Sequence, residues 1–100
     1  MNNYKVIKKN GKEIQSSFLL HPGRVLFKEL EARKIKKSDF ALQLQMRPSH
    51  FSELLHGKRN VSAGVAIKLE YLLGISAEFW MRVQTAYDIK VERQKLQLVQ

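Results

Sequence analysis

Apolar residues recur at steps of three and four from residue 22 onward, which is the spacing of amphipathic helices. The first predicted helix begins at Pro22, since proline suits a first-turn position, and its apolar stripe is Val25, Leu26 and Leu30. We expect His21, just before it, to form a hydrogen bond at the start of this helix.

A second helix is predicted to begin near residues 37–38, and its buried residues are Phe40, Ala41 and Leu44. It can continue for about two turns only, because Pro48 cannot lie inside a helix and disfavours helical geometry just before it. Pro48 instead suits the first position of a third helix, predicted over residues 48–56 with Gly57 as its C-cap. Only the residues QMR separate the two helices, so the pair predicts a helix-turn-helix corner.

Two more helices complete the pattern. Ser62 is the predicted N-cap of the fourth, which Gly74 ends and whose apolar residues are Val65, Ala66, Leu69, Leu72 and Leu73. Ser76 is the predicted N-cap of the fifth, along which Phe79, Val83, Tyr87 and Val91 recur with Trp80 beside them. So small a core cannot cover this whole stripe. We therefore predict a dimer seam formed by Trp80, Val83, Tyr87 and Val91.

The third predicted helix has two unlike faces. On a helical wheel its apolar residues, Phe51, Leu54 and Leu55, share one arc. The opposite arc carries Ser49, Ser52, Glu53 and His56, and His50 lies on the flank. A DNA-reading helix needs this division, because it must pack on its scaffold while it enters a groove about 12 Å wide. An ordinary amphipathic surface helix has the same division, so the pattern alone leaves both interpretations open.

The two ends of the chain differ from the helical part. Within residues 1–20, Tyr4 and Val6 alternate with lysines and Asn10-Gly11 is typical of a type I′ turn, which predicts a hairpin or an extended basic arm. Residues 21–90 form the predicted domain, and residues 91–100 are predicted to be a tail that continues the last helix. One hundred residues suit a single small domain, and the predicted fold class is all-α.

Charge points to the kind of partner. Eighteen Lys and Arg residues against nine Asp and Glu residues give a net charge of +9. Residues 34–61 hold six basic and two acidic residues, whereas residues 62–87 hold two of each. A solubilising surface and a polyanion-binding surface both fit this excess. Lys58 and Arg59 after the third helix, with Asn60 beside them, and Lys36 and Lys37 at the start of the second, lie where they can contact phosphates.

Several other classes of function are disfavoured. Cysteine is absent, so a disulfide framework and a thiolate metal site are excluded. The sequence has neither the apolar run of a signal peptide nor one long enough to span a membrane, which favours a cytoplasmic protein. Ser52 and His56 are one turn apart, but no acid is placed to orient the histidine as a base. His50 and His56 do not share a helix face, so no metal site, cofactor or enzymatic activity is predicted.

Three stretches carry a resemblance to a known family. The segments "HPGRVLFKEL", "SELLHGKRNVS" and "AIKLEYLLGISAEFWMRVQTAYD" resemble the HigA (VapI-like) antitoxins of the XRE/Cro helix-turn-helix superfamily. The resemblance runs from His21 to about Asp88, and its most specific parts are His21-Pro22-Gly23, residues 76–80 and residues 86–88. It implies a five-helix, lambda-repressor-like domain that dimerises, represses its own operon at a palindromic operator and neutralises a RelE-like, mRNA-cleaving toxin.

The resemblance also implies which residues contact DNA. Ser49, His50 and Ser52 fall where the superfamily reads bases. The residues predicted to contact the DNA backbone are Lys36, Lys37, Ser38, Arg47, Lys58, Arg59 and Asn60. A phage-type repressor without a toxin partner remains an alternative, and so does a protein-interaction module that no longer reads DNA.

Three residues depart from the pattern of the superfamily. Pro48 lies where a polar, base-contacting residue is common. Gln45 replaces the usual turn glycine, at a cost if the positive φ angle is kept. Lys36 takes the place of the usual Ser or Thr N-cap, so the second helix is expected to begin at Ser38 if the cap is lost.

Overall fold

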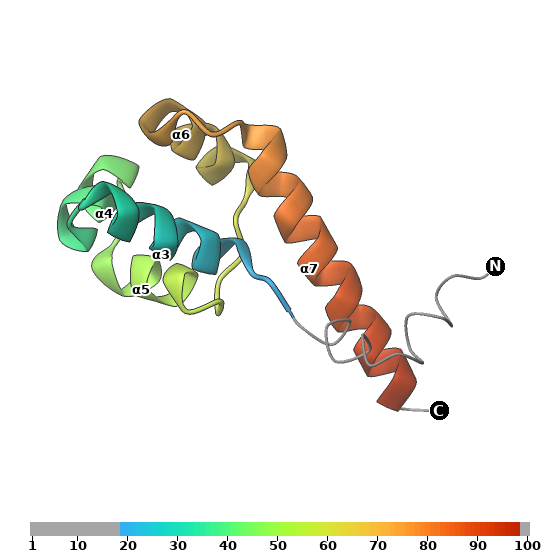
Figure 1. Ribbon diagram of the computed structural model, residues 1–100. Helices are drawn as coiled ribbons and strands as arrows, with labels where there is room; N and C mark the ends of the chain where they lie inside the picture. The colour runs from blue at the N-terminus through green and yellow to red at the C-terminus, as the bar shows by residue number, and fades with distance from the viewer. Residues whose placement is uncertain (1–18, 99–100) are drawn as a thin grey trace.

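A computed structural model describes residues 19–98, and within that range the chain folds into helices without a strand (Figure 1). The helices are α3 (Pro22–Arg33), α4 (Lys37–Leu44), α5 (Pro48–Leu55), α6 (Ala63–Leu73) and α7 (Ala77–Leu98). The all-α helix-turn-helix fold predicted from periodicity is therefore confirmed. The hairpin or arm predicted for residues 1–20 falls almost wholly on residues 1–18, which lie outside the described residues.

Helix ends follow the predicted capping residues. The His21 side chain accepts a hydrogen bond from the Gly23 N–H at 2.9 Å, as expected. Ser62 Oγ accepts from the Val65 N–H at 3.2 Å, and Ser76 Oγ accepts from the Phe79 N–H at 3.1 Å. Gly74 ends α6 at a φ angle of 74°, in the left-handed region that glycine adopts without strain.

The start of α4 falls within the predicted residues 37–38, at Lys37 and not at the alternative start Ser38, and the end of α5 differs from the prediction by one residue. Helix α4 begins at Lys37, because Lys36 takes the N-cap position although its side chain makes no capping hydrogen bond, so Ser38 lies inside the first turn. Helix α5 ends at Leu55, with His56 as its C-cap, and Gly57 follows at a φ angle of 77°.

The turn between α4 and α5 keeps its left-handed residue without glycine. Gln45 has a φ angle of 60°, so the conformational cost expected for this position, about 1–2 kcal/mol, is present. Lys68 of α6 crosses to the same turn, where its Nζ donates to the Leu44 carbonyl oxygen at 3.2 Å. The ammonium group thereby satisfies a carbonyl that the end of α4 leaves without a helical partner.

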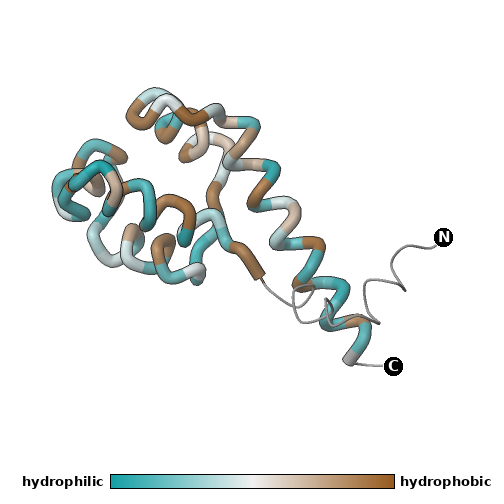
Figure 2. Tube along the Cα trace, in the orientation of Figure 1, coloured by the Kyte–Doolittle hydropathy of each residue, from teal (hydrophilic) through white to brown (hydrophobic). Residues whose placement is uncertain are grey.

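Apolar side chains from all five helices form one core. Along every helix, hydrophobic and hydrophilic stretches alternate, as amphipathic packing requires (Figure 2). The buried apolar residues are Leu26, Leu30, Phe40, Ala41, Leu44, Phe51, Leu54, Leu55, Val61, Ala66, Leu69, Leu73 and Trp80. Helix α5 packs on α3 and α4, and α7 packs along α6 and α3. The C-terminal half of α7 extends away from the other helices (Figure 1).

Candidate nucleic-acid interface

Helix α5 buries one face and exposes the other, as predicted. Phe51, Leu54 and Leu55 are each less than 5% exposed. On the opposite side Ser49 and Ser52 are exposed, and His50 is half-buried at the flank. The residues predicted to read bases therefore lie on the side of α5 that the core leaves accessible.

The position of α5 is fixed by a close approach of two backbones. Gly23, in the first turn of α3, lies so near Leu54 that a Cβ atom on it would collide with the Leu54 carbonyl oxygen. Only a residue without a side chain allows α3 and α5 to pack at this spacing. The His21-Pro22-Gly23 motif thus forms the start of α3 and also allows α5 to pack closely against it.

His56 does not form a catalytic pair with Ser52. The His56 Nδ1 atom lies 2.7 Å from the Ser52 carbonyl oxygen, to which it donates, and 3.5 Å from the Ser52 hydroxyl. The imidazole therefore closes the C-terminal turn of α5, where carbonyl groups need donors. The Ser52 hydroxyl remains exposed on the reading face. Residues 19–98 hold no group of three or more His, Cys, Asp or Glu residues that could bind a metal ion.

Cations predicted to contact the DNA backbone lie at both ends of α5. Arg47 precedes α5 as its N-cap and is exposed, and Lys58 is exposed just past its other end. The Arg59 guanidinium pairs with Glu53 of the same face at 3.0 Å. Since both side chains are about 40–47% exposed, solvent weakens this pair and DNA can compete for the cation.

Asn60, in the loop after α5, also contacts α7. Its Oδ1 atom accepts a hydrogen bond at 3.2 Å from Nε2 of Gln84, a residue of α7 that is 3% exposed. Gln84 also accepts from the Val61 N–H at 2.7 Å and donates to Asp88 at 2.9 Å. The Asn60 Oδ1 atom thus ties the loop after α5 to α7, while the residue itself stays exposed. Its contact with a phosphate remains a prediction.

One cation near this surface is missing from the sequence prediction. Arg24 and Lys37 lie over the same aromatic ring, with their charged groups 5.4 and 4.7 Å from the centre of Phe27. Together with Ser38 and Ser52 they border a groove of about 380 Å³ among α3, α4 and α5. The i, i+3 spacing of Arg24 and Phe27 was the available signal, but only the fold brings both to the start of α4.

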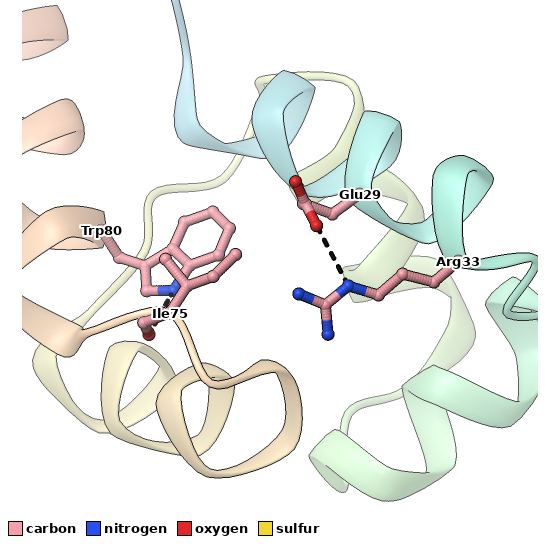
Figure 3. A network of polar contacts seen from close by, with 4 residues as sticks. All are labelled: Glu29, Arg33, Ile75 and Trp80. Carbon is pink, nitrogen blue, oxygen red and sulfur yellow. Dashed lines mark hydrogen bonds and ion pairs between the residues drawn. The ribbon is translucent and has the colours of Figure 1, made fainter.

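Trp80 does not belong to the predicted dimer seam. Trp80 is fully buried within its own chain, where its indole Nε1 donates to the Ile75 carbonyl oxygen at 3.2 Å (Figure 3). Its ring also meets Phe79 edge-on, with centroids 5.4 Å apart. Trp80 is therefore a core residue and has no surface to offer a second chain. Val83, Tyr87 and Val91 are half-buried along α7.

Ion pairs away from α5 lie on the surface. Glu29 and Arg33 of α3 pair one turn apart at 3.0 Å, and Glu92 and Lys95 of α7 pair at 3.2 Å (Figure 3 shows the first). Exposed pairs of this kind contribute at most about 1 kcal/mol each. They lie outside the surface that α5 presents.

A buried histidine joins α3 to α7 beneath this surface. His21 is 3% exposed, and burial lowers its pKa below the ordinary value for histidine, against opposing effects of Asn60 and Asp88. Because the charged imidazole is disfavoured there, His21 is neutral when it caps α3.

No helix within residues 19–98 is long and apolar enough to cross a membrane.

No protein-family model matches the chain, but individual proteins and solved structures are similar to it. The virulence-associated protein I of Dichelobacter nodosus is 32% identical over 81 residues, which are 80% of this chain and 75% of that protein. An addiction module antidote protein of the HigA family from Coxiella burnetii is 34% identical, with a TM-score of 0.70 over 76% of this chain and 84% of that one.

A third relative has been solved with DNA. The Pseudomonas aeruginosa antitoxin HigA, in a structure with the higBA promoter, is 28% identical to this chain. Its TM-score is 0.73, over 78% of this chain and 86% of that one.

Proposed function

The chain belongs to the HigA family of helix-turn-helix antitoxins, and on that premise we propose that it binds a palindromic operator as a homodimer and represses its own operon. The observation that carries the proposal is the surface of α5, where small polar side chains face outward between two sets of cations. This arrangement suits base contacts in the major groove with phosphate contacts on either side. The solved relative with its promoter supports it.

Base contacts are assigned to the exposed face of α5. Ser49 and Ser52 offer hydroxyl groups, and His50 offers a ring nitrogen at the flank. Short side chains of this kind let the helix lie deep in the groove. These three residues are the proposed readers of sequence.

Phosphate contacts are assigned to cations and helix ends. At the start of α4, Lys36, Lys37 and Ser38 lie where backbone N–H groups are unpaired and the helix dipole favours an anion. Arg24 joins this cluster across the ring of Phe27. The remaining contacts are Arg47, Lys58 and Arg59, with Arg59 exchanging Glu53 for a phosphate.

Dimerisation is assigned to the half-buried stripe of α7 formed by Val83, Tyr87 and Val91, of which Tyr87 also contacts His21 of its own chain. A two-fold axis there places the two α5 helices on one side of the dimer, about 34 Å apart, which is one turn of DNA. As the finer part of the proposal, the partner protein is a RelE-like toxin that the antitoxin neutralises by direct binding. The proposed compartment is the cytoplasm, where operator and toxin are both found.

A gel shift with the DNA upstream of the gene tests the proposal, over a series of salt concentrations. We expect binding that is specific against random DNA and weakens steeply as salt rises. Equal affinity for random DNA would contradict it and would favour the protein-interaction module. Co-expression with the neighbouring reading frame tests the toxin: restored growth and co-purification support an antitoxin. A neighbour that is harmless on its own favours a phage-type repressor.

A further inference from the structure

The first residue of α5 gives the reading helix an apolar end. Pro48 is exposed, and as a proline it has no backbone N–H to donate. Its ring presents only C–H groups to a molecule that approaches the helix. In a helix-turn-helix the N-terminal residues of the second helix contact base edges. This position therefore meets DNA with nothing that can recognise a hydrogen-bonding pattern.

Apolar surface continues from Pro48 into the groove beside it. Pro48 lines that groove together with Phe27, Phe51 and Leu55, while Ser52 lies one turn further along the same side of α5. The cations Arg24 and Lys37 are exposed and line the same groove, and none of the described residues that line it is acidic. These cations can hold backbone phosphates while a base edge reaches the ring of Pro48.

The major groove of DNA presents one apolar group, the C5 methyl of thymine. We infer that Pro48 is a specificity-determining residue, which selects a thymine in each half-site by packing its ring against this methyl group. The inference rests on the proposed DNA-binding function. Ser49 and Ser52 follow Pro48 at i+1 and i+4, so the selected thymine lies within or beside the base pairs that these serines contact.

Proline at this position also has a purely structural use, since it favours the first turn of a helix. The two roles make different predictions about DNA. A structural proline affects all sequences alike, whereas a reader of thymine responds to the loss of one methyl group. Deoxyuridine pairs as thymidine does and lacks only that methyl, so it separates the two roles.

The test uses the full-length protein and the operator located by footprinting. Each thymine of the half-site is replaced by deoxyuridine, symmetrically in both half-sites, and affinity is measured by fluorescence anisotropy. We expect one replacement to weaken binding about fourfold for each half-site, because it removes one methyl-sized group that is buried in the complex. The Pro48→Ala variant should bind the thymine operator and the deoxyuridine operator more nearly alike. Arg82→Ala, at an exposed position of α7 outside the proposed interface, should keep the full difference.

Two results would overturn the inference. In the first, the protein binds the operator specifically, but no deoxyuridine replacement weakens binding, or each replacement weakens binding by wild type and by Pro48→Ala equally. That result leaves the proposed function intact. The other is the absence of any specific operator binding by the wild-type protein, which would remove the proposed function as well. If Pro48→Ala folds poorly, Pro48→Ser takes its place in the comparison, and the deoxyuridine series on the wild-type protein still overturns the inference when no replacement weakens binding.

Discussion

The imidazole of His21 and the ring of Tyr87 meet edge to face, with centroids 4.7 Å apart and ring planes at 81°. The first residue of the His-Pro-Gly motif and the aromatic residue of the Ala-Tyr-Asp motif are therefore in contact, although 66 positions separate them in the chain. In the sequence, the first motif indicates only the start of a helix and the second only part of an apolar stripe. In the fold they form one joint between α3 and α7.

The stability of the protein should depend on pH through His21. Burial lowers its pKa, so the unfolded chain takes up a proton before the folded chain does. Stability from this group is complete above the ordinary pKa of about 6.5 and is lost as the pH falls below it, by at most about 1.4 kcal/mol per pH unit. In His21→Asn the side chain can still cap α3, but it does not titrate. Urea unfolding at pH 7 and pH 5.5 should show the larger loss in wild type, and equal losses would contradict the assignment.

A matched pair of glycine substitutions tests the contact between α3 and α5. Gly23→Ala should destabilise the fold by about 1–3 kcal/mol or more, because the new Cβ collides with the Leu54 carbonyl. Gly64→Ala meets only Ser62 Oγ, at 3.9 Å, within a helix, and should stabilise by up to about 1 kcal/mol. Thermal melts followed by circular dichroism measure both changes. If both variants change stability in the same direction, the close approach to Leu54 is not the reason that position 23 requires glycine.

Gln84→Ala should cost more stability than the side chain's size suggests. The substitution leaves the buried Val61 N–H without its acceptor, and frees the Asn60 and Asp88 side chains that Gln84 holds. An unsatisfied buried donor costs about 1–3 kcal/mol. Gln43→Ala, at an exposed position of α4, is the control and should change the free energy of unfolding by less than about 0.5 kcal/mol. Chemical denaturation compares the two, and equal effects would remove the special role of Gln84.

Arg24→Ala should weaken binding to all DNA sequences and lower the salt slope by about one, as expected for the loss of one phosphate contact. Arg82→Ala removes an exposed cation from α7, outside the proposed interface, and should leave the slope unchanged. Titrations at several salt concentrations, on operator and random DNA, make the comparison. A loss confined to operator DNA would instead make Arg24 a reader of bases.

Ser49→Ala should act differently, by changing preference at one base pair of each half-site while the salt slope stays the same. A good contact is worth about 1–3 kcal/mol of discrimination. A set of operators with single substitutions measures it. If Ser49→Ala and Arg24→Ala behave alike, the division into base and phosphate contacts is wrong.

Local signals account for most of what could be predicted. Helix caps and glycine ends depend on neighbouring residues, so His21, Ser62, Ser76 and Gly74 were readable from sequence and lie where expected. The exposed face of α5 was equally readable, because periodicity fixes which residues share a side. These features need no knowledge of how helices pack.

The errors concern contacts between distant parts of the chain. A stripe on a helical wheel does not say which neighbour covers it, so Trp80 was assigned to a dimer although α6 and the Ile75 carbonyl enclose it. The position of Asn60 after Lys58 and Arg59 likewise gives no sign that its Oδ1 accepts a hydrogen bond from Gln84, 24 positions away. Arg24 was missed because its importance comes from where α3 meets α4.

The absence of a side chain at Gly23 has a thermodynamic consequence for recognition. Where side chains separate two helices, rotamer changes let one helix shift on the other. Between Gly23 and Leu54 the contact is backbone against backbone, which leaves little such freedom. The reading helix is thus preorganised, and the entropy of fixing its orientation is lost during folding and not during binding. The affinity for DNA then reflects the chemistry of the exposed side chains, undiminished by the cost of positioning the helix that carries them.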